Sequence, residues 1–469
     1  MIRHPRSIGR RGARVTGLRR RPDSGRRHAF YLAIGFPPAV QDSADRMRAT
    51  ANQLVAQGWD VTVITAGRAA WEREHGLDAG LAELVDPRIR VVELPLVRAG
   101  LDTDIRAFTA ERSLDPVAWA AEADLRDREV FPEPQFGAWR PVLERALLDL
   151  HRRDPADLLV TTCAPFVGLA PTWRLWQEHR VPYVIDLRTG WSVGKTGAEA
   201  FTPASIAGRW EAKVLAEAVA VWCAEEPVAE HYRTRFPQLA ERLTVVPDGY
   251  DEADLPPLER HRGAGAGLRF GFLGTITFPT AQLTAVLDGW RKARAEDPAL
   301  ADATLEFRAR SGIGAARDDN APLELLRAAY DDGVRSGGPA PRSASAEVYA
   351  GWDVLLLIAA GGRYAPAGRA CEALATGMPV MSVHEAEHPA ARVLAGSPIW
   401  TGAAGLEADL IAESFRRAAR LALTATREDR LAARAAAAGH TRTALLEPVV
   451  RQVTATVLGT PVHAGEQLA

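Results

Sequence analysis

The feature that most constrains the fold is a pattern of short apolar runs separated by longer helical segments, which occurs twice along the chain. In the first series, the apolar runs are residues 31–36, 59–65, 89–94, 157–162, 182–187, 218–223 and 243–246. Helical spacing of apolar residues lies between them, most clearly at 44–57, 139–153 and 168–179. Apolar strands that alternate with helices of this length indicate a parallel sheet with helices on both faces.

The pattern restarts after a run of small residues at 262–267. The second series has strands expected at 268–273, 304–309, 353–358 and 379–383, with helices at 281–295, 322–333 and 369–376. We therefore predict an α/β fold with two Rossmann-like, doubly wound domains facing a cleft. Ligands of such sheets bind beyond the carboxyl ends of the strands.

The expected boundaries follow from these two series. Residues 1–28 are expected to be a disordered arm, 29–255 the N-terminal domain and 268–440 the C-terminal domain. Residues 441–469 are expected to form a helix that returns to the N-terminal domain, followed by a tail. Residues 97–134 are polar and irregular, which predicts a functional or mobile loop.

Charge is distributed unevenly along the chain. Residues 1–28 hold ten Arg and one Asp, whereas the remainder has a net charge of −11. The acidic body is unlike that of a nucleic-acid binder, so no nucleic-acid partner is expected. The basic arm lacks the apolar segment of a secretory signal. It is expected to be solvated, with contact to an anionic membrane surface as the alternative.

The cysteines and the hydropathy indicate the compartment. Cys163, Cys223 and Cys371 lie far apart and follow no metal-ligand spacing, so neither a zinc site nor a disulfide framework is expected. No apolar stretch approaches the length of a membrane span. We predict a cytoplasmic protein, with a peripheral position at the inner face of the membrane as the alternative that the arm allows.

One segment near the C-terminus carries the most specific pattern. Residues 368–380 read GRACEALATGMPV, which predicts a helix beginning at the cleft with Glu372 in its first turns. Small residues let that helix approach a strand closely, and Gly377 is placed to end it. On its own, an acidic residue near a helix start is usually only a partner of the helix dipole.

This string resembles the donor-binding helix of the family-4 glycosyltransferases, whose common form is G/S-K-x-x-E-x-x-A-x-G-x-P-V. Arg369 stands where Lys is usual. Other segments agree with the family in order and spacing: FPP at 36–38, FPEPQFGAW at 131–139, TTCAPF at 161–166, IDLRTGW at 185–191 and VVPDGYD at 245–251. The resemblance covers about residues 30–457. It implies the GT-B fold, with acceptor bound by the N-terminal domain and donor by the C-terminal domain.

The resemblance also implies roles for particular residues. Glu372 would bind the ribose hydroxyls of a nucleotide-sugar, and we expect it to be exposed to the cleft without a buried partner. Arginines would neutralise the diphosphate leaving group, with Arg369, Arg363 and Arg188 as candidates in that order. No metal and no cofactor are expected, since arginines can serve this purpose and no convincing D-x-D is present.

The candidate residues fall into three groups. The catalytic candidates are Arg369 and Arg188. The donor-binding candidates are Glu372, Arg369, Arg363, Gly368 and Gly274. The acceptor-side candidates are Asp186, Arg188, Trp191, Trp139 and Ser43, the last of which, or Asp42, can also cap the helix that follows it.

The chain departs from the family pattern at several points. The Glu that often precedes the ribose-binding Glu by eight residues is Tyr364 here, and the His of the S-P-P-H segment is Phe166. The Arg and Lys pair usual after the first strand of the C-terminal domain is absent from 272–283. Lys195 belongs to GWSVGKT, which lacks the first glycine of a P-loop; it is expected in a basic lip beside Arg188 or in a solvated loop.

These observations favour a retaining hexosyltransferase that uses a nucleoside-diphosphate sugar and a hydroxyl acceptor. The acceptor could be a glycan, a lipid-linked intermediate or a natural product. Two alternatives stay open. One is a divergent GT-B protein that binds nucleotide-sugar without transfer or needs a partner, and the other is a nucleotide-sugar 2-epimerase.

Overall fold

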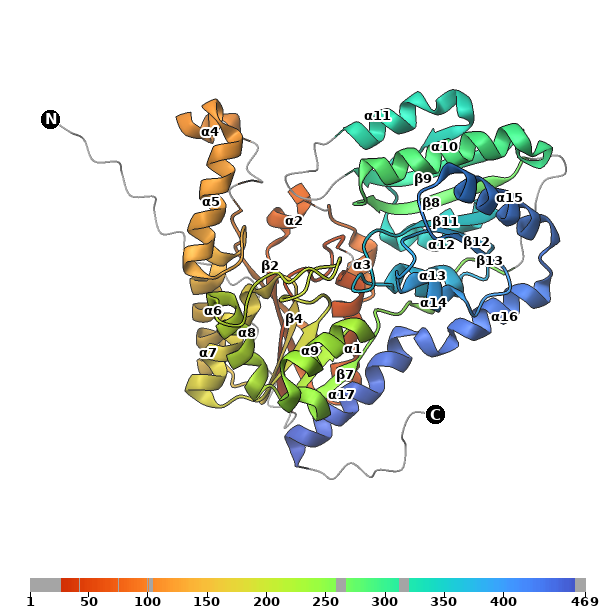
Figure 1. The fold of residues 1–469 in the computed structure, drawn as a ribbon. Helices are drawn as coiled ribbons and strands as arrows, with labels where there is room; N and C mark the ends of the chain where they lie inside the picture. Colours follow the sequence, from red (N-terminus) through yellow and green to blue (C-terminus); the bar gives the residue numbers. More distant parts are fainter. Residues whose placement is uncertain are drawn as a thin grey trace.

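The computed structural model of the chain describes residues 27–41, 43–74, 76–98, 100, 104–258, 267–311 and 320–459. These residues form two α/β domains (Figure 1), each built on one parallel sheet. The predicted fold class is therefore confirmed. The expectations for the arm up to residue 26 and for most of the small-residue linker lie outside the described residues.

The N-terminal domain contains a seven-stranded sheet with the order β3-β2-β1-β4-β5-β6-β7. Its strands are β1 (His28–Leu32), β2 (Asp60–Ala66), β3 (Arg90–Leu94), β4 (Leu158–Cys163), β5 (Tyr183–Leu187), β6 (Ala220–Cys223) and β7 (Leu243–Val245). Its helices are α1 (Ala44–Ala56), α2 (Arg68–Glu74), α3 (Ala79–Glu83), α4 (Ala110–Leu114), α5 (Pro116–Val130), α6 (Arg140–Arg153), α7 (Leu169–His179), α8 (Ile206–Glu217) and α9 (Glu226–Arg235).

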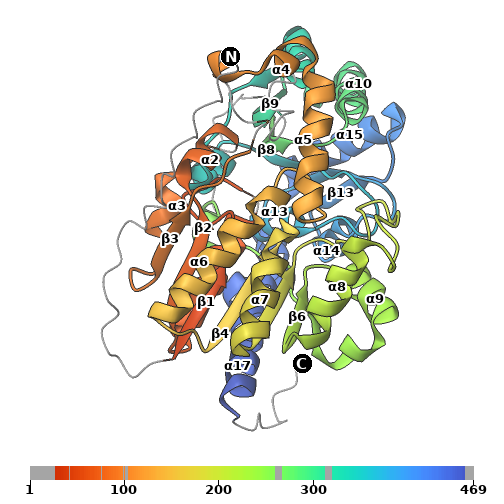
Figure 2. The ribbon, with the colours of Figure 1, turned by 90° about the vertical axis from the view of Figure 1, so that its left-hand side faces the viewer.

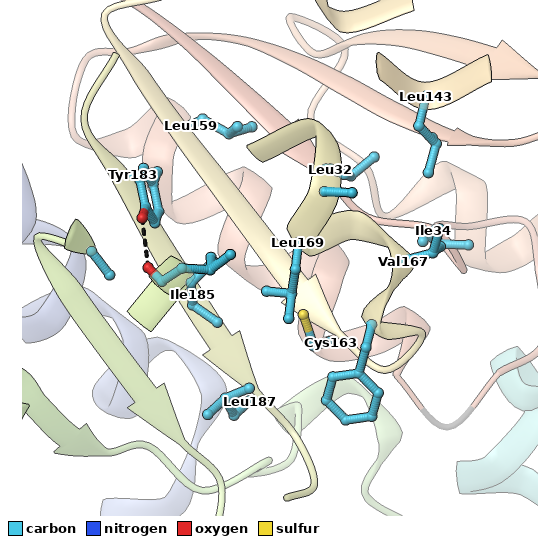
Figure 3. Close-up of a cluster of buried hydrophobic side chains, with 14 of the residues drawn as sticks. Leu32, Ile34, Leu143, Leu159, Cys163, Val167, Leu169, Tyr183, Ile185 and Leu187 are labelled. Atoms are coloured by element: carbon cyan, nitrogen blue, oxygen red, sulfur yellow. Dashed lines mark hydrogen bonds between the residues drawn. The ribbon is translucent and has the colours of Figure 1, made fainter. Parts of the chain in front are cut away.

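Both faces of this sheet are buried because side chains alternate along each strand. On β1, Phe30 and Leu32 join the core beneath α6 and α7, whereas Ala29 and Tyr31 join the core on the opposite face, beneath α1. Figure 3 shows the first of these cores, where side chains of β1, β4 and β5 meet those of α6 and α7. Near-continuous apolar strands are the sequence signature of a sheet covered on both sides.

The C-terminal domain contains a six-stranded sheet with the order β10-β9-β8-β11-β12-β13. Its strands are β8 (Arg269–Ile276), β9 (Thr304–Ser311), β10 (Val334–Ser336), β11 (Val354–Ile358), β12 (Val380–Val383) and β13 (Trp400–Ala403). Its helices are α10 (Thr280–Glu296), α11 (Ala321–Ala328), α12 (Ser345–Ala350), α13 (Gly368–Ala375), α14 (Ala390–Leu394), α15 (Ala408–Thr424) and α16 (Arg427–Ala437). Helices α10 and α15 cover one face, and α13 and α14 the other.

The last described helix, α17 (Arg442–Leu458), packs against α1 of the N-terminal domain. Figure 1 shows α16 and α17 running in succession from the C-terminal domain along the lower edge of the molecule. Leu446, Val450 and Val453 join the apolar core beneath α1, and Trp59 Nε1 donates a hydrogen bond to Thr454 Oγ1 at 2.9 Å. After the C-terminal sheet, the chain therefore returns to the N-terminal domain and packs against it through α17.

The structure corrects three expectations from the sequence. Strand β1 begins at His28, inside the span assigned to the arm. The edge strands β10 and β13 are not predicted from the sequence, because strands of three and four residues have no distinctive apolar pattern. The segment 97–134, expected to be irregular, contains α4 and α5, which extend upward beyond the rest of the N-terminal domain (Figure 1 and Figure 2). No residue of α5 is buried, so it lacks the apolar stripe by which packed helices are recognised.

Within the described ranges, no helix combines the length and the apolar character needed to cross a membrane.

Candidate functional site

A cavity of about 230 Å³ lies between the two domains, where the carboxyl ends of both sheets meet. The N-terminal domain contributes its β1–α1 loop, the loop after β5 and the loop after β7, and the C-terminal domain contributes β8, β9 and the start of α13. Its charged lining consists of Arg188, Lys195, Arg308, Arg310, Arg342, Arg369, Arg442, Asp45, Asp248 and Glu372. The cavity therefore gathers an excess of cationic side chains over carboxylates.

Glu372 lies on α13 at the wall of this cavity, but it is not an open carboxylate. Its two oxygens accept hydrogen bonds from the two terminal nitrogens of Arg342, each at 2.7 Å, and Oε1 also accepts one from the Tyr349 hydroxyl. Only 3% of Glu372 is exposed. Our expectation of an exposed Glu372 without a buried partner was wrong. Its partners are Arg342, in the segment before α12, and Tyr349 of α12, and the sequence around Glu372 does not reveal them.

Arg342 also joins the two domains. Its Nε donates to Asp45 Oδ2 of α1 at 3.1 Å, across the cleft from Glu372. Burial alone would raise the pKa of Glu372, but the charge and hydrogen bonds of Arg342 bring it down to about 2. Burial opposes ionisation of Asp45 too, yet Arg342, Arg442 and Arg48 hold its pKa below the ordinary value. Both carboxyls are thus ionised at neutral pH, and Arg342 bridges them.

The start of α13 brings Arg369 and Gly368 to the cavity. The Arg369 guanidinium donates to the backbone oxygen of Leu273 at 3.2 Å, at the carboxyl end of β8. Gly274 beside it has φ +147°, and a Cβ there would lie 3.2 Å from an Arg369 nitrogen. A side chain at Gly368 would lie 2.7 Å from Cβ of Asp248. Glycine at 274 and 368 therefore lets β8 and Asp248 approach α13.

Two carboxylates of the N-terminal domain face the start of α13. Asp248 accepts hydrogen bonds from Arg188, at 3.2 Å from Nε and 2.6 Å from a terminal nitrogen. Burial would raise the pKa of Asp248, but Arg188 and Arg46 lower it below the usual range. Glu225 accepts a hydrogen bond of 2.6 Å from the backbone N–H of Ala367, and burial raises its pKa to about 7.

Arg188 therefore reaches the cleft, while Asp186, two residues before it, does not. Asp186 is fully buried and accepts two hydrogen bonds from Arg46, at 3.0 and 2.7 Å, and a third from Thr162 at 3.2 Å. Arg46 donates in turn to the backbone oxygens of residues 246 and 247, at 2.7 and 2.9 Å. Asp186 holds α1 and the loop after β7 in place, and it does not line the cleft cavity.

The two candidate tryptophans are also packed inside the N-terminal domain. The Trp191 ring stacks on Phe131 and Phe166, with ring centroids 5.6 and 5.0 Å apart. Trp139 is buried, and its Nε1 donates to the backbone oxygen of Pro95 at 2.8 Å. Neither tryptophan lines the cleft cavity. The segments that contain Phe131, Phe166 and Trp191 instead form a buried aromatic cluster.

Ser43 and Arg363 complete the candidate set. Ser43 stands at the N-cap of α1, but its side chain makes no capping hydrogen bond; its hydroxyl donates to Gln41 Oε1 at 3.3 Å. Gln41, not Ser43, lines the cavity. Arg363 is half-exposed and pairs with Glu230 of the N-terminal domain at 2.9 Å, away from the cavity lining. The alternative cap, Asp42, lies outside the described residues.

Sequence reasoning missed the residues that surround Glu372 and the arginines of β9. Arg342 and Tyr349 lie 30 and 23 residues before Glu372. Arg308 and Arg310 belong to β9, for which the sequence predicts an end at residue 309, before Arg310. Alternation of Glu306, Arg308 and Arg310 with buried neighbours was the available signal, since it shows one polar face on β9.

No group of three or more His, Cys, Asp or Glu side chains in the described part of the chain is arranged to hold a metal ion. All three cysteines are buried and free.

Comparisons with known proteins agree with this architecture. Residues 43–249 match the model of the glycosyl transferase 4-like domain. No curated protein sequence matches the chain. Sucrose-phosphate synthase from Thermosynechococcus elongatus has a similar fold, with a TM-score of 0.61 and 16% identity over 92% of this chain and 100% of that one.

Two further solved structures are similar. The UDP-forming α,α-trehalose-phosphate synthase from Burkholderia vietnamiensis has a TM-score of 0.59 and 13% identity, covering 93% of this chain and 100% of its own. A putative UDP-N-acetylglucosamine 2-epimerase from Listeria monocytogenes has a TM-score of 0.57 and 10% identity, covering 93% and 98%. At these identities, the likeness concerns the fold.

Proposed function

We propose that this chain is a glycosyltransferase that moves a hexosyl group from a nucleoside-diphosphate sugar to a hydroxyl acceptor with retention, because residues 43–249 match the glycosyl transferase 4-like domain and the chain has the GT-B fold. The observation that carries the proposal is the cationic cavity between the domains, with Arg369 and Glu372 on its wall. Two of the similar structures are named for chemistry with UDP or a UDP-sugar, which supports this donor class.

In the proposed reaction, Arg369 contacts the donor diphosphate. As the glycosidic bond breaks, negative charge grows on the leaving diphosphate, so a guanidinium at that position stabilises the transition state more than the ground state. Arg188 lies on the opposite wall and is the second cation proposed for this role. Its hydrogen bond to Asp248 holds the Arg188 guanidinium at that wall.

Glu372 is proposed to bind the ribose hydroxyls. A carboxylate has about four lone-pair positions, of which three are used by Arg342 and Tyr349. Binding of a vicinal diol by two hydrogen bonds therefore requires Arg342 to move or to share its acceptor. The contacts between Arg342 and Glu372 therefore support a donor site in which the Arg342 side chain shifts before the ribose binds.

A donor-hydrolysis assay tests the proposal. Labelled nucleoside-diphosphate sugars are incubated with the protein without acceptor, and slow release of free sugar with nucleoside diphosphate is expected. Release of the 2-epimer would favour the epimerase, which the Listeria monocytogenes likeness keeps as the second candidate. Tight binding without any turnover would favour a protein that binds nucleotide-sugar and does not transfer it.

A further inference from the structure

Two arginines on β9 face the cleft at the end of the neighbouring strand. Arg308 and Arg310 alternate with the buried Phe307, Ala309 and Ser311, so they share one face of the sheet. In the parallel register of β8 and β9, Arg308 lies opposite Leu273 and Arg310 opposite Thr275. Both line the cavity between the domains. They therefore flank the same strand end at which Arg369 binds the Leu273 carbonyl.

The surroundings of Arg308 leave one of its N–H groups available for a hydrogen bond to a ligand. Its buried Nε–H has no acceptor among the described residues. The nearest carboxylate is Glu306, 3.8 Å from an Arg308 terminal nitrogen, and that carboxylate already accepts the Trp352 indole N–H at 2.8 Å. Because a buried N–H without an acceptor is unfavourable, this donor is suited to an anionic group that enters the cavity.

Arg310 reaches toward the opposite domain. A Cβ built on Gly76, between α2 and α3, would lie 3.3 Å from an Arg310 terminal nitrogen. The absence of a side chain at Gly76 allows the guanidinium to approach that loop. Arg308 and Arg310 therefore lie at the interface of the two domains, where they can contact a ligand bound in the cavity between the domains.

The charge of the whole cavity points the same way. Seven cationic side chains and three carboxylates line it, and one of the cations, Arg442, is also paired with Asp251 outside the lining. The donor diphosphate of a nucleotide-sugar would bring about two negative charges. The cations that remain in excess over nearby carboxylates repel one another in a partly enclosed cavity, so the cavity attracts an anion.

We infer that Arg308 and Arg310 form a phosphate-binding pair in the cleft. Guanidinium groups match the oxygens of a phosphate in pairs of parallel hydrogen bonds, which suits this residue type. The phosphate comes from the donor diphosphate or from an acceptor that itself carries a phosphate. The identity of those ligands rests on the proposed function, whereas the phosphate site does not.

The test uses the double variant Arg308→Gln and Arg310→Gln of the full chain, with Arg420→Gln as the control. Arg420 lies on the exposed surface of α15, where it pairs with Glu413 at 3.1 Å. Binding is measured by calorimetry with inorganic pyrophosphate, with UDP, GDP, ADP and TDP, and with glucose 6-phosphate; uridine and glucose are the phosphate-free probes. A melting curve of each variant checks that it is folded.

The double variant is expected to bind at least one phosphate probe tenfold or more weakly than the wild type, while Arg420→Gln binds as the wild type does. Weaker binding of pyrophosphate and nucleoside diphosphate assigns the phosphate to the donor. Weaker binding of glucose 6-phosphate alone assigns it to the acceptor. If the double variant does not fold, the Lys variants at both positions, which keep the charge and lose the fork geometry, are expected to weaken the same probes.

The inference is overturned if folded variants bind every phosphate probe as tightly as the wild type, or if the wild type binds none of them. Its failure is distinguishable from failure of the proposed function. A wild type that binds pyrophosphate through Arg308 and Arg310, but no nucleoside diphosphate, would retain the phosphate site and contradict the nucleotide-sugar proposal.

Discussion

Removing Arg342 while keeping Glu372 is expected to destabilise the protein strongly at neutral pH. The pKa of Glu372 lies at about 2 in the folded chain, against an ordinary value of 4.5, and Arg342 is what lowers it against the effect of burial. That difference is worth about 3 kcal/mol of stability at pH 7. The variant Arg342→Met keeps a side chain of similar length, so it leaves the buried carboxylate without its cationic partner. We expect a loss of about 3–5 kcal/mol in the free energy of unfolding.

Urea unfolding of the wild type, Arg342→Met, Glu372→Gln and the double variant measures this effect. Glu372→Gln removes the buried charge and keeps its shape, so Arg342→Met should cost about 2 kcal/mol less in that background. The depressed pKa also fixes the pH dependence. The contribution of the pair is present above pH 4.5 and is lost as the pH falls toward 2. A cost under about 1 kcal/mol at pH 7, or an equal cost in both backgrounds, would refute this reasoning.

Three further changes test other parts of the site. Arg369→Ala should lower kcat by about 10–100-fold with a smaller change in KM, because its contact is expected to strengthen in the transition state; steady-state kinetics with raised KM and unchanged kcat would contradict this. Asp186→Asn should lower stability in urea by about 3 kcal/mol or more, because it breaks the buried pair with Arg46, and leave acceptor KM unchanged in the folded protein. Glu225→Gln should remove a pH dependence of the melting temperature, because the buried Glu225 carboxyl has a pKa of about 7 in the folded chain and 4.5 is its ordinary value. The folded chain therefore favours the protonated carboxyl, a contribution that is fully present below pH 4.5 and is lost as the pH rises through 7. Over that range, the melting temperature of the wild type should fall relative to that of the variant.

Much of the fold can be predicted from local sequence patterns. Buried parallel strands have near-continuous apolar residues, and the expected strands at 157–162 and 182–187 lie within one residue of β4 and β5. Gly377 has φ +65° just beyond the end of α13, where its lack of a side chain allows that turn. The edge strand β13 escaped detection because a four-residue strand with half-buried residues has no distinctive pattern.

The site was harder to predict because its contacts join distant segments. The motif placed Arg369 and Glu372 correctly on one helix, but the partner that changes the chemistry of Glu372 comes from a loop in another part of the C-terminal domain. Asp186 lies in a family-like motif, yet burial of Arg46 beside it makes the carboxylate part of the interior. A sequence motif identifies the segment, whereas the fold decides which of its side chains reach the cleft.

The most direct test of the proposed donor site is the melting temperature of the wild-type protein in the presence of UDP, GDP, ADP or TDP. A ligand that binds only the folded chain stabilises it by about 2.7 kcal/mol when present at 100 times its dissociation constant. We predict that at least one nucleoside diphosphate raises the melting temperature and that the matching nucleoside, which lacks phosphate, does not. If none of the four raises it at millimolar concentration, or if the nucleoside acts as well as its diphosphate, the proposed nucleotide-sugar cleft is contradicted.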